Sequence, residues 1–253
     1  MQTNIKGYAI HYEQVQNGSQ GSLVLIHGAG SDGEIWSKLS GCLASEFTVV
    51  VPDLPGHNLS EGEPYSTVDD YASSIIAFIN SLNLPRPIII AGHSMGGAIA
   101  LSIALSNPDL PDGLIMIDSA ARLQVLPQFL EQLGQGIIDA NFLGFGFAVS
   151  TPEAVKKDFL ADAVKVPVGI YFNDFTACSK FDVREQIDRL QCPLLLLVGD
   201  EDRLTPVKLS EFIKQKVSPA IMTVIPQAGH FTMLEQPQAL SQAINDFVSR
   251  LAG

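Results

Sequence analysis

Apolar residues occur in two kinds of run along this chain, and the two kinds alternate. Short, largely apolar runs that end in loops rich in glycine, proline or aspartate predict strands, and the runs 23–26, 47–51 and 192–199 are expected to be buried strands. They occupy residues 23–26, 47–51, 88–91, 113–118, 192–199 and 221–225. Longer segments between several of them carry apolar residues at helical spacing, most clearly from Thr67 to Leu84. This alternation predicts an α/β domain with a doubly wound, mostly parallel central sheet.

The two ends of the chain add a hairpin and a helix. Residues 5–15 alternate between apolar and polar side chains, which is typical of an antiparallel strand or hairpin at a sheet edge. A turn is predicted at residues 17–21. After the last predicted strand, apolar residues from Leu240 to Leu251 recur at helical spacing and predict a closing amphipathic helix.

The stretch from Ile88 to Ala100 places a serine between a predicted strand and a predicted helix. The apolar run stops at Gly92-His93-Ser94-Met95-Gly96, a Gly-x-Ser-x-Gly pattern, and an alanine-rich helical pattern follows. In this context the pattern predicts a nucleophile elbow, a sharp turn that exposes the serine hydroxyl. Ser94 is therefore the candidate nucleophile, close to the positive end of the following helix.

A second loop at the end of a predicted strand can supply hydrogen-bond donors to the same place. His27-Gly28-Ala29-Gly30 follows the run 23–26, and its small residues allow an N–H group to turn toward the neighbouring serine. We predict that the backbone amides of Ala29 and Met95 form an oxyanion hole. His27 precedes this loop directly and is assigned an orienting or packing role.

Two later loops contain the candidate acid and the candidate base. Asp202 lies mid-loop between the run 192–199 and the helix that begins at Pro206, so its side chain can turn inward. His230 follows Ala-Gly after the last predicted strand, where the general base is expected. Asp118, at the end of another core strand, is the alternative acid because a catalytic triad is defined by geometry.

The turn formed by residues 52–60 also contains a carboxylate and an imidazole. Two prolines and a glycine predict a fixed surface turn there. Side chains in such turns usually bond nearby backbone groups, so Asp53 and His57 are expected to act locally and not in the chemistry.

The alternation stops after residue 120 and resumes near residue 186. Residues 121–185 contain eight of the 13 phenylalanines, and glycines interrupt their helical pattern. We predict a helical cap (lid) inserted after the sixth core strand, over a core domain of residues 1–120 and 186–253. Most of the rings should pack the cap onto the core, and a minority should line an apolar substrate pocket. The candidate substrate contacts are Phe142, Phe145, Phe147 and Phe231.

Composition and charge narrow the range of partners. Of the 253 residues, 46% are hydrophobic and 17% are charged, the balance of a compact globular protein. A net charge of −12 argues against nucleic acid and anionic membrane surfaces as partners. No signal-peptide pattern and no apolar run of about 18 residues occurs, so we expect a cytoplasmic protein without a membrane span, monomeric or homodimeric. We expect no metal or cofactor, and we expect reduced thiols at Cys42, Cys178 and Cys192.

Taken together, the motifs resemble those of the α/β-hydrolase fold superfamily, over essentially the whole chain. They are His27-Gly28-Ala29-Gly30, Pro52-Asp53-Leu54-Pro55-Gly56-His57 and Gly92-His93-Ser94-Met95-Gly96-Gly97, with Ser94, Asp202 and His230 in that order. The chain is most similar to capped esterase and lipase-like members. This resemblance implies a serine hydrolase that cleaves small-molecule carboxylic esters with a small to medium, apolar acyl group.

Other activities of the same fold share nearly the same motifs. Cofactor-free haloperoxidases, C–C bond hydrolases of vinylogous diketones and the menaquinone-pathway synthase are open alternatives. Epoxide hydrolases and haloalkane dehalogenases are disfavoured, because they use an aspartate where this chain has Ser94. C–C bond cleavage would need a polar cap group such as Arg122 to hold an acidic substrate. The alternative outside enzymes is a ligand-binding protein that keeps the fold without turnover.

Overall fold

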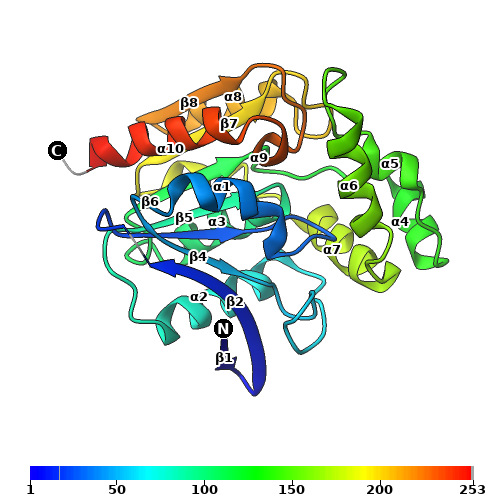
Figure 1. Cartoon of the computed structure of the whole chain (residues 1–253), viewed down its shortest axis with the longest axis horizontal. Coiled ribbons are helices and arrows are strands. Elements are labelled where there is room, and N and C mark those ends of the chain that lie inside the picture. Colours follow the sequence, from blue (N-terminus) through cyan, green and yellow to red (C-terminus); the bar gives the residue numbers. More distant parts are fainter. Residues whose placement is uncertain (17, 252–253) are drawn as a thin grey trace.

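One central sheet organises the chain. The computed structural model describes residues 1–16 and 18–251, and within them eight strands pair in the order β1-β2-β4-β3-β5-β6-β7-β8 (Figure 1). The strands are β1 (Gln2–Ile5), β2 (Tyr8–Gln16), β3 (Ser22–Ile26), β4 (Thr48–Pro52), β5 (Ile88–His93), β6 (Gly113–Ile117), β7 (Leu194–Gly199) and β8 (Ala220–Ile225). Strand β2 is antiparallel to β1 and β4, and the other neighbours are parallel. The predicted doubly wound, mostly parallel α/β sheet is confirmed.

Both faces of the central strands are buried, which explains their uninterrupted apolar runs. On β3, Leu23 and Leu25 belong to the apolar cluster on one face of the sheet, whereas Val24 and Ile26 belong to the cluster on the other face. Side chains alternate across a strand, so a strand covered on both sides needs apolar residues at every position.

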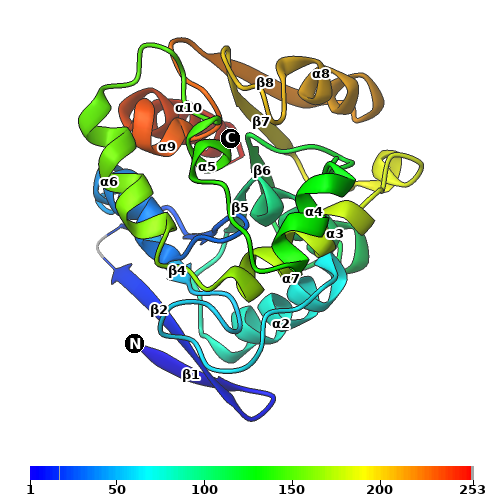
Figure 2. The same cartoon turned by 90° about the vertical axis from the view of Figure 1, so that its right-hand side faces the viewer.

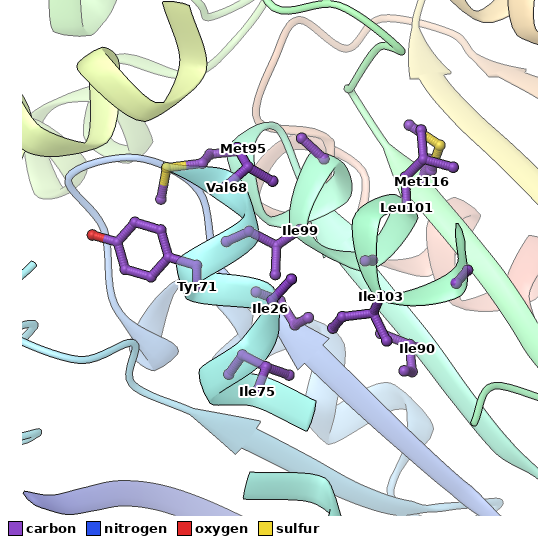
Figure 3. Packing of buried hydrophobic residues seen from close by; sticks show 14 of the residues in the cluster. Ile26, Val68, Tyr71, Ile75, Ile90, Met95, Ile99, Leu101, Ile103 and Met116 are labelled. Carbon is purple, nitrogen blue, oxygen red and sulfur yellow. The ribbon is translucent and has the colours of Figure 1, made fainter. Parts of the chain in front are cut away.

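Helices cover the two faces of the sheet. They are α1 (Ser37–Leu43) and α10 (Pro237–Leu251) on one face, and α2 (Val68–Ser81), α3 (Met95–Ser106) and α8 (Val207–Lys216) on the other. The short helices are η1 (Gly33–Trp36), η2 (Ile187–Arg189) and α9 (Thr232–Glu235). Figure 3 shows Ile75 of α2 and Ile99 of α3 near Ile26 of β3, and Ile103 of α3 beside Ile90 of β5. This apolar layer fixes α3, whose first turn follows Ser94.

Element boundaries follow local signals closely. Thr67 caps α2, and its side chain accepts a hydrogen bond of 3.2 Å from the Asp70 amide. The helix ends at Ser81, a few residues before the predicted end at Leu84. The alternating segment 5–15 forms most of a β1–β2 hairpin, as predicted. The predicted turn at 17–21 includes Asn17, which lies outside the described residues.

Four helices lie between β6 and β7, in residues 121–185, which we call the insert. They are α4 (Pro127–Gly134), α5 (Ala140–Gly144), α6 (Glu153–Ala163) and α7 (Val168–Lys180). Figures 1 and 2 show them gathered at one end of the sheet. Phe129, Leu133 and Tyr171 belong to an apolar cluster built from insert residues. This separate cluster supports the proposal that the insert is a cap on the core domain.

Two expectations from composition concern membranes and thiols. Among the helices of the described residues, none has the length and apolar character needed to cross a bilayer. Cys42, Cys178 and Cys192 are free in the structure. Cys178 is buried on α7, where burial raises the pKa of its thiol, and Cys42 and Cys192 are half-buried.

Candidate active site

The turn between β5 and α3 holds Ser94 in a strained backbone conformation. Its φ is +52° and its ψ is −115°, outside the helical region. A Cβ on Gly92 would lie 2.0 Å from the Gly96 carbonyl oxygen, and a Cβ on Gly96 would lie 2.2 Å from the Ile26 carbonyl oxygen. Only glycine allows β5, α3 and β3 to approach this closely. As a result Ser94 is partly exposed while its neighbours in the chain are buried.

Two backbone amides beside this turn lack a protein partner. Within the described residues, the N–H groups of Ala29 and Met95 donate no hydrogen bond, although Met95 is itself buried. They follow β3 and β5, which are parallel neighbours in the sheet. A Cβ on Gly28 would lie 3.3 Å from the Ser94 Cβ, so the loop after β3 abuts the serine. Free donors of this kind can stabilise an oxyanion.

The loop after β7 and the loop after β8 join in a carboxylate–imidazole pair. Asp202 Oδ2 lies 2.9 Å from His230 Nδ1, and both side chains are buried. The Leu204 and Thr205 amides donate to Asp202 Oδ1 at 2.8 and 2.9 Å, and the Thr205 hydroxyl donates to Oδ2 at 2.6 Å. Because the carboxylate accepts the proton on Nδ1, the neutral ring of His230 carries its lone pair on Nε2.

The pKa values of Asp202 and His230 depend on their burial and on the attraction between their opposite charges. Burial alone opposes ionisation of Asp202, but the charge of His230 and the hydrogen bonds from His230 and Thr205 hold its pKa well below the usual range. Burial alone would also lower the pKa of His230, but the Asp202 carboxylate outweighs it and raises that pKa. The pair therefore favours an ionised carboxylate and a strengthened base.

His93, which precedes Ser94, joins the turn of the serine to the loop of the base. His93 Nε2 lies 2.7 Å from the His230 carbonyl oxygen, which can only accept, so Nε2 carries the proton. Burial and, after it, the nearby His230 together lower the pKa of His93 to about 3, so the ring is neutral. The rings of His93 and His230 are 4.8 Å apart. No sequence pattern predicted this role of His93.

The serine and the base are neighbours through this link but are not hydrogen-bonded to each other. Within the described residues, the Ser94 hydroxyl makes no hydrogen bond to His230. Such bonds are often long in enzymes without substrate and shorten in the reacting complex. The assignment of Ser94, Asp202 and His230 as a triad is a proposal.

Asp118, the alternative acid, occupies a different position. Its Oδ1 accepts a hydrogen bond of 2.9 Å from the Gly199 amide, and its Oδ2 accepts one of 2.7 Å from the Thr232 hydroxyl. Burial raises the pKa of Asp118, and the negative charge of Asp202 raises it further. Asp118 thus links the end of β7 to the start of α9, and within the described residues it makes no hydrogen bond to His230.

The turn at residues 52–60 makes local bonds, as expected, and also bonds to distant parts of the chain. Asp53 Oδ1 accepts from the Gly33 amide at 2.9 Å, and its Oδ2 lies 2.9 Å from His11 Nδ1. His57 Nδ1 lies 3.0 Å from the Pro55 carbonyl oxygen, a local contact. Its other nitrogen, Nε2, lies 2.9 Å from Asp174 in the insert, which sequence analysis did not anticipate.

The four phenylalanines predicted as substrate contacts lie in three different environments. Phe142 packs against other rings of the insert, with a centroid distance of 4.0 Å to Phe129. Phe145 is exposed and lies under the guanidinium of Arg203. Phe147 and Phe231 are buried with ring centroids 4.7 Å apart.

Of these four rings, Phe231 lies nearest to the candidate base. Its ring centroid lies 5.6 Å from that of His230 and 5.7 Å from that of His93. Contact of any of the four rings with substrate stays a prediction.

A cavity of about 700 Å³ opens beside the loop after β3. Its lining includes Gly30, directly after Ala29, together with His57 and the apolar side chains of Phe159, Val166 and Ile170. The four predicted phenylalanines are not among its lining residues, whereas Phe159 of α6 is. The cavity has the size of a small-molecule site and is formed between the core and the insert.

Comparison with known proteins places this arrangement in context. The model of the alpha/beta hydrolase family matches residues 23–243. The chain is 27% identical to pimeloyl-[acyl-carrier protein] methyl ester esterase of Pectobacterium carotovorum, over 93% of this chain and 97% of that protein. It is 24% identical to 3-oxoadipate enol-lactonase 2 of Acinetobacter baylyi, over 96% of this chain and 94% of that protein. A thermophilic esterase from Thermogutta terrifontis superposes with a TM-score of 0.90 at 25% identity, over 100% of both chains.

Proposed function

Because this chain belongs to the alpha/beta hydrolase family, we propose how it acts. It cleaves carboxylic esters with a small to medium, apolar acyl group through an acyl-enzyme on Ser94. The chain is a carboxylic ester hydrolase, as the names of its relatives and structural neighbours indicate. This class of activity argues against the alternative hypothesis that the chain is a ligand-binding protein without turnover. The acyl group and the mechanism are the parts that we propose.

The proposed reaction begins with attack of the Ser94 hydroxyl on the ester carbonyl. His230 Nε2 takes the hydroxyl proton, and the resulting imidazolium is stabilised by Asp202, 2.9 Å from Nδ1. The negative charge that develops on the carbonyl oxygen is received by the amides of Ala29 and Met95.

The tetrahedral intermediate then collapses. The C–O bond to the alcohol breaks, and the leaving oxygen takes the proton from His230, which leaves an ester between the acyl group and Ser94. Water, activated by the same imidazole, hydrolyses this ester in the second half of the reaction. The serine is thereby regenerated, and no metal or cofactor enters the scheme.

One observation carries the proposal. The His230–Asp202 pair is joined, through the bond of 2.7 Å from His93 to the His230 carbonyl, to the turn that bears Ser94. The proposed nucleophile, base and acid come from three distant segments and are connected through these bonds. The free amides of Ala29 and Met95 add the donors that acyl transfer requires.

Arg122 bears on the alternative of C–C bond cleavage. That activity would use Arg122 to hold an acidic substrate, but Arg122 Nε lies 3.7 Å from Asp182 Oδ2, and both side chains are partly exposed. Asp182 also pairs with Arg184 at 2.7 Å. Arg122 is not among the residues that line the cavity beside the loop after β3, which favours ester hydrolysis over the diketone reaction.

Acyl-chain length is the first test of the proposal. We expect kcat/KM for p-nitrophenyl esters to be highest for acyl chains of roughly two to six carbons and to fall at least about tenfold by twelve, because the gain of about 0.8 kcal/mol per buried methylene ends where the pocket ends. Steady-state assays across the series measure this. A vinylogous diketone serves as the comparison substrate, and turnover of the diketone without turnover of any ester would overturn the proposal.

The pH dependence is the second test. His230 must be neutral to take the serine proton, and Asp202 raises the pKa of His230 above its usual value of 6.5. We therefore expect kcat/KM to be low in acid, to rise through an apparent pKa above 6.5, and to level off in alkali. Rates from pH 5 to 9, corrected for spontaneous hydrolysis, measure this. A rate that does not change between pH 5 and 8 would exclude His230 as the base.

A further inference from the structure

A second buried carboxylate–imidazole pair joins the insert to the core. Asp174 of α7 is fully buried and accepts three hydrogen bonds, all from residues of the core domain. Its Oδ2 accepts from the Gly30 amide at 2.8 Å and lies 2.9 Å from His57 Nε2. Its Oδ1 accepts from the Tyr71 hydroxyl at 2.6 Å. One side chain thus holds the loop after β3, the turn 52–60 and helix α2.

The proton positions in this cluster follow from its neighbours. The Tyr65 amide donates to the Tyr71 oxygen at 3.0 Å, so the Tyr71 proton is directed to Asp174. His57 Nδ1 faces the Pro55 carbonyl oxygen and Nε2 faces the Asp174 carboxylate, so each nitrogen faces an acceptor. This arrangement fits an imidazolium paired with a carboxylate.

The surrounding charges agree with this assignment. Burial alone would lower the pKa of His57, but the Asp174 carboxylate outweighs it and raises that pKa, with a smaller contribution from Asp53. His27, with its ring centroid 5.0 Å from that of His57, is neutral, because its Nε2 accepts the Leu54 amide and burial lowers its pKa to about 3.

Shape adds to charge at the same contact. Gly30 has a φ of +61°, and a Cβ there would lie 1.9 Å from the ring of Tyr171, one turn before Asp174 on α7. Helix α7 therefore presses directly on the backbone of the loop. The cavity lined by Gly30 and His57 begins beside this contact.

The two peptide groups that flank Ala29 are both held. The peptide between Gly28 and Ala29 is fixed by His27 Nδ1, 2.9 Å from the Gly28 carbonyl oxygen, and the Ala29 N–H points the opposite way across this trans peptide. The next peptide is fixed by the bond from the Gly30 amide to Asp174. If only one of the two were held, the Ala29 backbone could rotate.

We propose that Asp174 is a positioning residue for the oxyanion hole. By accepting the hydrogen bond of the Gly30 amide, Asp174 aligns the Ala29 amide, so catalysis depends on how the insert packs against the core domain. The proposal rests on the role given above to Ala29 in ester hydrolysis. Asp174 touches neither substrate nor the reacting atoms; it acts through the backbone of the loop.

The test compares Asp174→Asn with Asp182→Asn, an exposed aspartate of the same insert, in the full-length protein. We expect Asp174→Asn to lower kcat for p-nitrophenyl acetate by about 10- to 100-fold with KM within about threefold, since a single oxyanion donor contributes about 10²–10³ in kcat. Affinity for a trifluoromethyl ketone, whose adduct needs the oxyanion hole, should fall in parallel. Asp182→Asn should leave both quantities within about twofold of wild type.

A second readout does not depend on esterase activity. Hydrogen–deuterium exchange of peptides covering residues 27–33 should accelerate by about 100-fold or more in Asp174→Asn and stay unchanged in Asp182→Asn. Asparagine offers one acceptor oxygen and an NH2 group where the carboxylate accepts from Gly30, His57 and Tyr71, so the bond from the Gly30 amide is weakened. If wild type hydrolyses no ester, the proposed function fails, and the exchange data alone decide whether Asp174 holds the loop.

Two outcomes would overturn the positioning role. One is exchange at residues 27–33 equal to wild type. The other is a loss of thermal stability in Asp174→Asn with kcat and ketone affinity unchanged, which would make the contact merely structural. Should Asp174→Asn fail to fold, Asp174→Glu takes its place: it keeps the charge, moves the oxygens by one methylene, and is expected to lower kcat in the same way.

Discussion

Ser94→Ala is expected to lower kcat for a short-chain p-nitrophenyl ester by about 10⁶-fold, the order of loss seen when a serine nucleophile is removed from a triad. The hydroxyl is the atom that bonds to the acyl carbon, and the remaining amides and base can only assist water. Alanine fits the strained backbone at φ +52° as serine does, so the fold should persist. Steady-state rates, with circular dichroism to verify folding, measure the effect.

A matched serine controls for the loss of a hydroxyl on the same helix. Ser106, the last residue of α3, donates 2.7 Å to the Ser102 carbonyl and is far along the chain from the turn. Ser106→Ala is expected to keep kcat within about twofold of wild type, because the Ser106 hydroxyl bonds only to nearby groups at the end of α3. If Ser94→Ala kept more than a tenth of wild-type turnover, acyl transfer to Ser94 would be excluded.

Asp202→Asn is expected to lower kcat by about 10⁴-fold, because an amide in that place favours the wrong tautomer of the imidazole and cannot stabilise the imidazolium. The rise of the rate with pH should also occur at lower pH. The attraction of the Asp202 carboxylate, which raises the pKa of His230, is then gone, and burial lowers that pKa. Rates across pH for wild type and variant measure both effects.

Asp118→Asn is the comparison that separates the two candidate acids. Asp118 bonds the Gly199 amide and the Thr232 hydroxyl, so the variant should lose stability, by about 1–3 kcal/mol for an unsatisfied buried group, with a loss of kcat below about tenfold. Thermal or denaturant unfolding measures the first quantity. Equal losses of kcat in the two variants would assign the acid role to Asp118 as well.

The elbow could be predicted from sequence because its determinants are contiguous. Gly92, Ser94 and Gly96 lie within five residues, and the strand and helix on either side carry their own periodicity. The choice between Asp202 and Asp118 is different, since both follow buried strands of the same sheet. It depends on which carboxylate turns toward the loop after β8, and that is a property of packing.

Other contributors had no local signal. His93 acts through the carbonyl of residue 230, which is 137 positions away in the chain. Asp174 meets the Gly30 amide across 144 positions. The phenylalanine content of the insert indicated apolar packing, but it did not indicate that Phe145 would lie exposed under Arg203 while Phe159 lines the cavity.

The sequence by itself determined the order of strands and helices, the mostly parallel sheet, and the loops that carry the candidate nucleophile, base and oxyanion donors. These features follow from hydrophobic period and from glycine and proline at turns, which act over a few residues. Only the tertiary structure decided which carboxylate faces His230, how the insert meets the loop of Ala29, and which rings line the cavity. Those contacts join segments far apart in the chain. Their partners depend on the packing of α7, β7 and the loops around them, and this packing produces no periodic pattern in the sequence.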